Sequence, residues 1–105
     1  MKRSIEWAAG LFEGEGCIYS GKNSRQLILQ MSDKDVVESF CDIVGVGSVK
    51  EQDIAKRTGN PNHKKGYRWI VCNKKDIISV LDKLLPYLGN QRAYKALNIL
   101  DDLEL

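Results

Sequence analysis

The stretch that decides the interpretation of this chain is Trp7-Ala8-Ala9-Gly10-Leu11-Phe12-Glu13-Gly14-Glu15-Gly16, close to the N-terminus. Apolar residues recur here at spacings of three and four, which predicts a helix over residues 5–15. Two carboxylates fall in its last turn, where the helix dipole disfavours negative charge by about 0.3 to 1 kcal/mol each. A cation held at the helix end would explain them. A glycine-capped surface helix with two solvated glutamates is the alternative.

The same helix carries small residues. Gly10 and Gly14 are four positions apart and, with Ala9, are expected to form a smooth stripe. Because the distance between packed helices depends on side-chain size, such a stripe allows another helix to approach closely.

The rest of the chain alternates hairpins with helices. Strands are predicted at 17–20, 26–31, 46–54 and 67–72, with a polar loop at 58–66. Further helices are expected from Ser32 or Asp33 to Gly45, from Asn73 to Pro86, and from about Asn90, with Ala93, Leu97, Leu100 and Leu103 facing inward. With no linker or internal repeat, residues 1–105 are expected to form one α+β domain, in which helices cover one face of a single four-stranded antiparallel sheet.

Composition narrows the class of protein. The chain has 105 residues, of which 43% are apolar and 29% charged, as in globular proteins. No apolar run approaches the roughly 20 residues that span a membrane, and an acid precedes any apolar segment at the N-terminus, so an intracellular and not a secreted protein is expected. Three scattered cysteines and one histidine argue against zinc and predict reduced, buried thiols.

Positive charge is concentrated in the middle of the chain. Residues 21–75 hold 11 Lys and Arg against 6 Asp and Glu. This asymmetry favours a polyanionic partner. Lysines that keep a hairpin edge soluble would produce the same pattern.

Residues Ala8 to Gly16 resemble the nine-residue motif of the LAGLIDADG homing endonucleases, with Ala in place of the first Leu and Glu in place of both Asp. The resemblance extends over essentially the whole chain, since the order of elements agrees, as do Gly45-Val46-Gly47 and Leu85-Pro86-Tyr87-Leu88. It implies an αββαββα(α) domain with a saddle-shaped sheet.

The resemblance also implies a homodimer in which two motif helices pack together through Ala9, Gly10, Glu13 and Gly14. Glu15, with Gly14, would hold Mg²⁺ beside the scissile phosphates, and Mn²⁺ or Ca²⁺ would substitute in binding. No small-molecule cofactor and no membrane are expected. Glu13 lies roughly 200° around the helix from Glu15, so it is expected to brace the helix end instead.

Two supporting catalytic positions depart from the family pattern. Asp33, or alternatively Gln30, would orient solvent, although Asp33 also fits a simple helix cap. By its spacing from Pro86, Gln91 matches the family's basic residue, but it is not basic. Its neighbour Arg92 is therefore expected to take that role, with a structural salt bridge as the alternative.

Strand alternation predicts the DNA contacts. The residues expected on the sheet face away from the apolar stripe are Tyr19, Gln26, Ile28, Gln30, Ser48, Lys50, Gln52, Arg68 and Ile70. The residues expected in or near loops, facing phosphates, are Lys22, Arg25, Lys56, Arg57, Lys64 and Lys65. Trp7, Tyr67 and Trp69 follow the apolar periodicity and are assigned to the core.

The sequence therefore predicts a homodimeric, site-specific, Mg²⁺-dependent endonuclease that cleaves double-stranded DNA at a pseudo-palindromic target. A non-cleaving DNA-binding regulator or an RNA-splicing maturase on the same fold is the first alternative. A small dimerisation or interaction domain, whose smooth helix serves only assembly, is the second.

Overall fold

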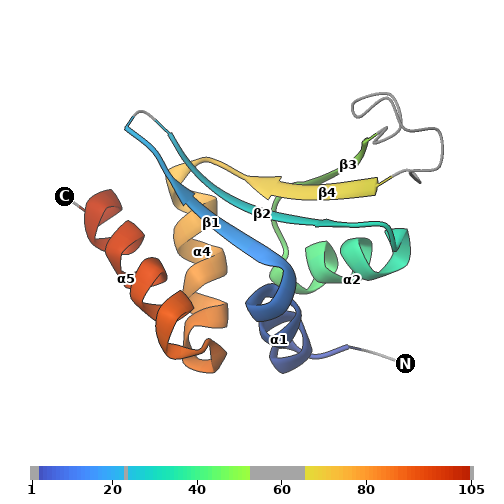
Figure 1. The fold of residues 1–105 in the computed structure, drawn as a ribbon, viewed down its shortest axis with the longest axis horizontal. Helices are drawn as coiled ribbons and strands as arrows, with labels where there is room; N and C mark the ends of the chain where they lie inside the picture. Colours follow the sequence, from blue (N-terminus) through green and yellow to red (C-terminus); the bar gives the residue numbers. More distant parts are fainter. Residues whose placement is uncertain (1–2, 23, 53–65, 105) are drawn as a thin grey trace.

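The computed structural model describes residues 3–22, 24–52 and 66–104 (Figure 1). Its elements, in chain order, are α1 (Ile5–Glu15), β1 (Gly16–Ser20), β2 (Arg25–Met31), α2 (Lys34–Val44), β3 (Ser48–Gln52), β4 (Gly66–Val71), α4 (Lys74–Leu84), the 3-10 turn η1 (Leu85–Tyr87) and α5 (Asn90–Glu104). This order is the one that the hydrophobic periodicity predicts.

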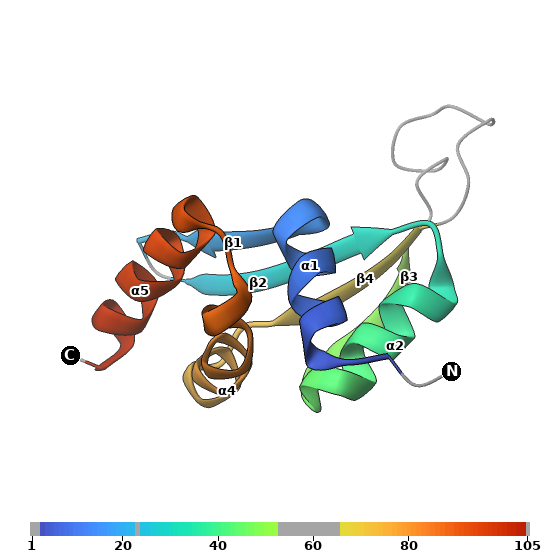
Figure 2. The same cartoon turned by 90° about the horizontal axis from the view of Figure 1, so that it is seen from below.

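The four strands form one antiparallel sheet in the order β1-β2-β4-β3. The α-helices of the described residues, α1, α2, α4 and α5, lie on the same side of this sheet. Helix α1 runs beneath the middle of the sheet, between α2 and the pair α4 and α5 (Figures 1 and 2). The α+β fold class is therefore confirmed. The sheet has an inner face against the helices and an outer face that none of the described helices covers.

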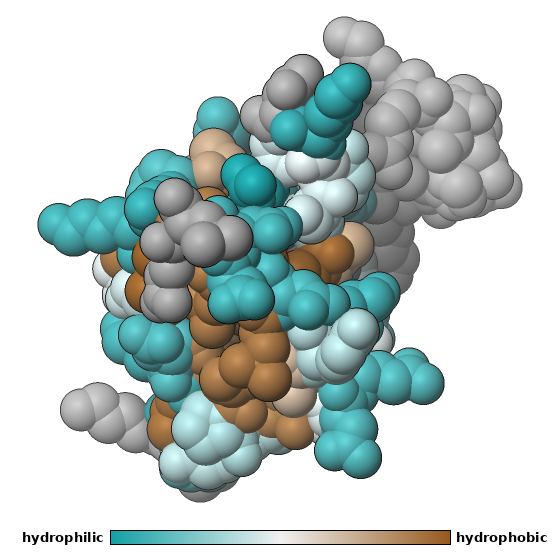
Figure 3. All heavy atoms as spheres, turned by 90° about the vertical axis from the view of Figure 1, so that its left-hand side faces the viewer, coloured by the Kyte–Doolittle hydropathy of each residue, from teal (hydrophilic) through white to brown (hydrophobic). Residues whose placement is uncertain are grey.

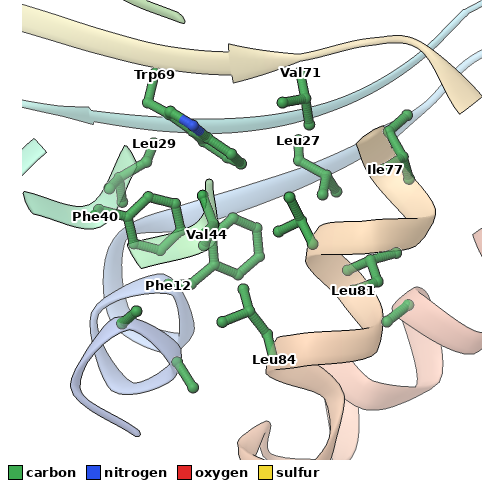
Figure 4. Packing of buried hydrophobic residues seen from close by; sticks show 14 of the residues in the cluster. Phe12, Leu27, Leu29, Phe40, Val44, Trp69, Val71, Ile77, Leu81 and Leu84 are labelled. Carbon is green, nitrogen blue, oxygen red and sulfur yellow. The ribbon is translucent and has the colours of Figure 1, made fainter. Parts of the chain in front are cut away.

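The core fills the space between the inner face and the helices (Figure 4). Trp69 from β4 is completely buried, and its ring meets Phe40 of α2 edge-on with centroids 4.8 Å apart. Phe12 of α1 stacks on Phe40 at 6.1 Å. The Trp69 indole N–H donates to the carbonyl oxygen of Val46 at 2.9 Å, so burial leaves no unpaired donor there. The assignment of Trp69 to the core is confirmed.

Local signals set several element ends. Gly45 ends α2 with a φ of 81°, in the left-handed region that glycine adopts without strain. Gly47 also has a positive φ, of 96°, so β3 begins at Ser48 and not at Val46. Asn73 caps the start of α4, as its spacing from Asp76 predicts: its side-chain oxygen accepts from the Asp76 N–H at 2.9 Å, and its side-chain amide donates to Asp76 Oδ2 at 2.7 Å.

Helix α5 is rotated relative to the sequence prediction. Leu97 is 54% exposed, whereas Ala96, Ile99 and Leu100 are buried. The prediction that Leu97 faces inward is wrong because the helix has two apolar lines in different phases, and the one through residues 96, 99 and 100 meets the core. Figure 3 shows apolar surface on the side of the molecule where α5 lies.

The predicted burial of the cysteines is wrong for two of the three. Cys17 and Cys72 are exposed and Cys41 is half-buried. Residues 53–65, which include nearly all of the loop predicted at 58–66, lie outside the described residues. None of the helices in the described ranges has the length and apolar character to cross a membrane.

Candidate nucleic-acid interface

The outer face carries a polar row across three strands. Arg68 of β4 pairs in register with Gln30 of β2 on one side and with Lys50 of β3 on the other. The Arg68 Nε–H donates to Gln30 Oε1 at 3.2 Å, and this bond is half-buried. The guanidinium is thus oriented across the sheet surface by its neighbour, while Lys50 is exposed.

A second row on the outer face is more apolar. Ile28 of β2 pairs with Cys17 of β1 and with Ile70 of β4, and Ile70 pairs with Ser48 of β3. Both isoleucines are half-buried, although no described helix covers them. This row gives the centre of the face an apolar surface beside the polar row.

The remaining predicted outer positions also fall in phase. Tyr19 is 49% exposed and pairs with Gln26, and Gln52 pairs with Gly66 at the other end of the sheet. A shallow hollow of about 400 Å³ lies beside the polar row, bordered by Ser48, Lys50, Ile70, Cys72, Asn73, Asp76 and neighbouring backbone.

Arg25 differs from the other predicted DNA contacts. It is the first residue of β2, alternates in phase with Leu27, and pairs with Ser20. It is half-buried, and its Nε atom is buried without a hydrogen-bond partner among the described residues. Lys22 is exposed in the β1–β2 turn. Lys56, Arg57, Lys64 and Lys65 lie outside the described residues.

The motif helix leads directly into the edge strand of the sheet. Gly16 ends α1 and begins β1, and its N–H donates to the Phe12 carbonyl oxygen. A Cβ atom on Gly16 would overlap the Phe12 ring, so the tight passage from helix to strand requires glycine here. Glu15, immediately before it, is exposed. A carboxylate and nearby backbone carbonyls are the oxygen ligands that Mg²⁺ accepts, so Glu15 and Gly14 are chemically suited to that ion.

Glu13 points elsewhere, as the helical geometry predicts. Its side chain lies beside Gly89, the residue just before α5. A Cβ on Gly89 would be only 2.5 Å from Glu13 Oε1. Arg92 of α5 donates from Nε to the Glu13 backbone oxygen at 2.9 Å and lies 3.9 Å from Glu13 Oε2. Arg92 therefore has the structural salt bridge that was the alternative to a phosphate contact.

The glycines of α1 present an open surface. Gly10 and Gly14 are exposed, and a Cβ added to either would meet no described atom within 4 Å. Ala9 cannot join them as an interface residue, because its side chain is completely buried in the core of its own subunit. Its small size predicts a place on the stripe, but its position on the helix circumference points it inward.

The other candidate catalytic residues are dispersed. Asp33 is exposed at the N-cap position of α2, and its side chain makes no capping hydrogen bond. Gln91 is exposed in the first turn of α5. In the described part of the chain, no three Asp, Glu, His or Cys side chains gather as a metal-binding group.

Gly89 lies beside the side chain of Glu13 in the motif helix, a closeness that the sequence alone does not predict. Gly89 occupies the position before α5 where Ser, Thr, Asp or Asn usually caps a helix. The absence of a capping side chain at the start of α5 is the sequence feature that indicates a capping group from another part of the fold.

Comparison with known proteins confirms the resemblance at the level of the fold. No family model matches the sequence, and no curated protein matches it either. The crystal structure of the homing endonuclease I-CvuI, in complex with the I-CreI target (C1221) in 2 mM Mg with the DNA not cleaved, matches with a TM-score of 0.72 at 21% identity. The match covers 95% of this chain and 65% of that chain.

Two further structures agree. I-CvuI in complex with its target (Sro1.3) in 2 mM Ca gives a TM-score of 0.70 at 22% identity, again covering 95% of this chain and 65% of that one. The homing endonuclease I-TnaI gives 0.74 at 20% identity, covering 99% of this chain and 76% of that one. The chain thus has the LAGLIDADG homing endonuclease fold and spans 65% of the length of the I-CvuI chains.

Proposed function

We propose that this chain is one subunit of a homodimeric, site-specific endonuclease that cleaves double-stranded DNA with the help of Mg²⁺. The observation that carries the proposal is the junction of α1 and β1. There the exposed carboxylate of Glu15 stands at the start of the strand that forms one edge of the uncovered sheet face. The acid and the proposed DNA-binding surface thus belong to one continuous piece of backbone.

The outer face has the chemistry to read a DNA groove. Arg68 uses Nε to bond Gln30, and the two terminal nitrogens of its guanidinium are the pair of donors that suits guanine O6 and N7. Lys50 would meet a phosphate. The apolar row of Ile28 and Ile70 suits contact with thymine methyl groups. In I-CvuI, which shares the fold, the structures are complexes with DNA targets.

Glu15 and the Gly14 carbonyl are the groups that would hold Mg²⁺ in this proposal, with Mn²⁺ or Ca²⁺ able to replace it in binding. A bound divalent metal would activate water and stabilise the leaving oxygen of the cleaved bond. Glu15 is the more exposed of the two motif carboxylates, since the Glu13 side chain turns toward α5. Two copies of Glu15 come together only if two chains pack through the open stripe of Gly10 and Gly14. Asp33 or Gln30 would orient solvent, and Gln91 or Arg92 would contact the phosphate.

Replacing Glu15 with Gln tests the nuclease proposal. A target is first selected from random DNA in Ca²⁺, and cleavage is then measured in Mg²⁺. Glu15→Gln should abolish cleavage while leaving DNA affinity unchanged, because it removes the ligand charge and keeps the side-chain size. Glu38→Gln, at an exposed site on α2, is the matched control and should cut normally. Cleavage by Glu15→Gln at the wild-type rate would contradict the assignment, and binding without cleavage by the wild type would favour a regulator.

Replacing Gly10 with Leu tests the dimer. Gly10 is exposed, and a Cβ there would meet no described atom within 4 Å apart from its chain neighbours and its own helix backbone, so each subunit should fold normally. Between two closely packed helices it would hold the backbones apart and weaken association. Sedimentation velocity should show a wild-type dimer, a Gly10→Leu monomer, and a dimer for the control Glu38→Leu. A wild-type protein that stays monomeric at micromolar concentration would overturn the dimer proposal.

A further inference from the structure

The last turn of α1 is tied to α5 by a contact between residues far apart in the sequence. The final carbonyl groups of a helix lack partners within the helix and carry the negative end of its dipole. The Gly16 N–H satisfies the Phe12 carbonyl, and the Arg92 Nε–H donates to the next carbonyl, that of Glu13, at 2.9 Å. A cationic donor therefore caps the helix end from which Glu15 projects.

The Glu13 side chain reaches in the opposite direction, from α1 to the start of α5. Its Oε1 lies 2.5 Å from the place that a Cβ on Gly89 would take. The Gly89 carbonyl accepts the Ala93 N–H at 2.8 Å, so Gly89 occupies the N-cap position of α5 without a capping side chain. A carboxylate at this point is favoured by the positive end of the α5 dipole. Each helix end thus faces a side chain of opposite charge from the other helix.

The contact is partly shielded from water. The Arg92 and Glu13 side chains are 26% and 39% exposed, with Nε and Oε2 3.9 Å apart. The guanidinium carbon lies 5.9 Å from the centroid of the Phe12 ring, which is completely buried. Arg92 is therefore held by a backbone oxygen, a carboxylate and a ring, all of which belong to the last turn of α1.

We propose that Arg92 is a positioning residue that acts through Glu13. Together the two side chains fasten the first turn of α5 to the last turn of α1 and fix the direction in which Glu15 leaves the helix. This inference rests on the proposed role of Glu15 in DNA cleavage. It assigns Arg92 to the support of the motif helix and leaves Gln91 as the candidate for the phosphate contact.

A double-mutant cycle in cleavage tests the proposal. The four proteins are wild type, Glu13→Gln, Arg92→Met and the double variant, with Lys95→Met as a control that removes an exposed positive charge one turn further along α5. Arg92→Met should lower kcat by about ten- to hundred-fold, because misplacing a catalytic group slightly has effects of that size. DNA affinity measured in Ca²⁺ should stay at the wild-type value. The double variant should be no slower than Arg92→Met.

A direct contact between Arg92 and the DNA phosphate would give a different pattern. The losses in Glu13→Gln and Arg92→Met would then multiply in the double variant, because the two side chains would act on different groups. Multiplying losses, or wild-type cleavage by Arg92→Met, would overturn the proposal.

Hydrogen exchange provides a readout that does not depend on cleavage. In Arg92→Met, the amides of residues 14–18 should exchange about ten- to hundred-fold faster, as expected when a charged hydrogen bond that closes a helix end is lost. Lys95→Met should leave them unchanged. Unchanged exchange in Arg92→Met would overturn the fastening. If wild type fails to cleave while exchange responds as expected, the nuclease proposal fails and the fastening of the two helices stands.

Discussion

The two faces of the sheet are made by the same strands but differ in burial. On the inner face Leu27, Leu29 and Trp69 are completely buried and hold the helices in place. On the outer face their sequence neighbours, including Ile28 and Arg68, are half-buried with no described helix above them. Because successive side chains on a strand point to opposite sides, stability and recognition can be assigned to alternate residues of one segment.

The difference in burial has an energetic consequence. A buried aromatic side chain contributes several kcal/mol to folding, whereas a surface substitution away from such features changes stability by about 0.5 kcal/mol or less. The outer face is therefore free to vary its side chains without loss of the fold, which is what a surface that recognises particular DNA sequences requires.

Adjacent residues of β4 provide the strongest test of this separation. Trp69→Ala should destabilise the protein by about 3 to 5 kcal/mol, because it leaves a cavity against Phe12 and Phe40. Arg68→Ala should destabilise the protein by only about 1 kcal/mol, the net value of its hydrogen bond to Gln30, because it leaves no cavity in the core. Urea unfolding of both variants measures the difference. Equal destabilisation by the two substitutions would mean that the outer face is covered in solution.

DNA binding should distinguish two residues of the same outer row. Arg68→Ala should lose about 1 to 3 kcal/mol of discrimination at one base pair in each half-site, because the donors that face a base edge are removed. Lys50→Ala should weaken binding to all sequences alike and reduce the slope of log K against log salt by about 1.8, the value for two phosphate contacts, one from each subunit. Titrations of selected and altered targets at several salt concentrations measure both. Identical profiles for the two variants would remove Arg68 as a base-reading residue.

The sequence was sufficient for features set by near neighbours. Period-two alternation predicts the outer positions of Gln30, Lys50 and Arg68, and the strand pairing places them in one row. Gly45 predicts the C-terminal end of α2, and the pair Asn73 and Asp76 predicts the N-terminal end of α4. These signals act over a few residues, so a single sequence contains them.

Features set by distant contacts could not be predicted in the same way. The bond from Arg92 to Glu13 joins residues 79 positions apart, and neither side chain indicates the other. The phase of α5 is decided by which of two apolar lines meets the core, so Leu97 was misplaced. The direction in which the Ala9 side chain points depends on how α1 packs beneath the sheet, and the size of that side chain does not determine it.

Thiol labelling of the cysteines tests which face of the sheet binds DNA, with the smallest expected effect, because each cysteine shows whether one position is accessible. Cys17 and Cys72 are exposed, Cys17 in the apolar row and Cys72 beside the hollow near Lys50. Cys41 is half-buried beneath the sheet, and burial, reinforced by Asp42 and Glu38, raises the pKa of its thiol. Since the thiolate is the reactive form, Cys41 should be labelled slowest and should need a higher pH than an ordinary cysteine.

Bound DNA should then slow the labelling of Cys17 and Cys72 several-fold and leave Cys41 unchanged, as followed by mass spectrometry of labelled peptides. High salt should remove the protection, because it dissociates a complex that depends on phosphate contacts. Protection of Cys41 in place of the other two would place DNA on the helical side of the sheet. Because the probe reads two positions on one face and one beneath it, this outcome would exclude the outer face even if cleavage were never observed.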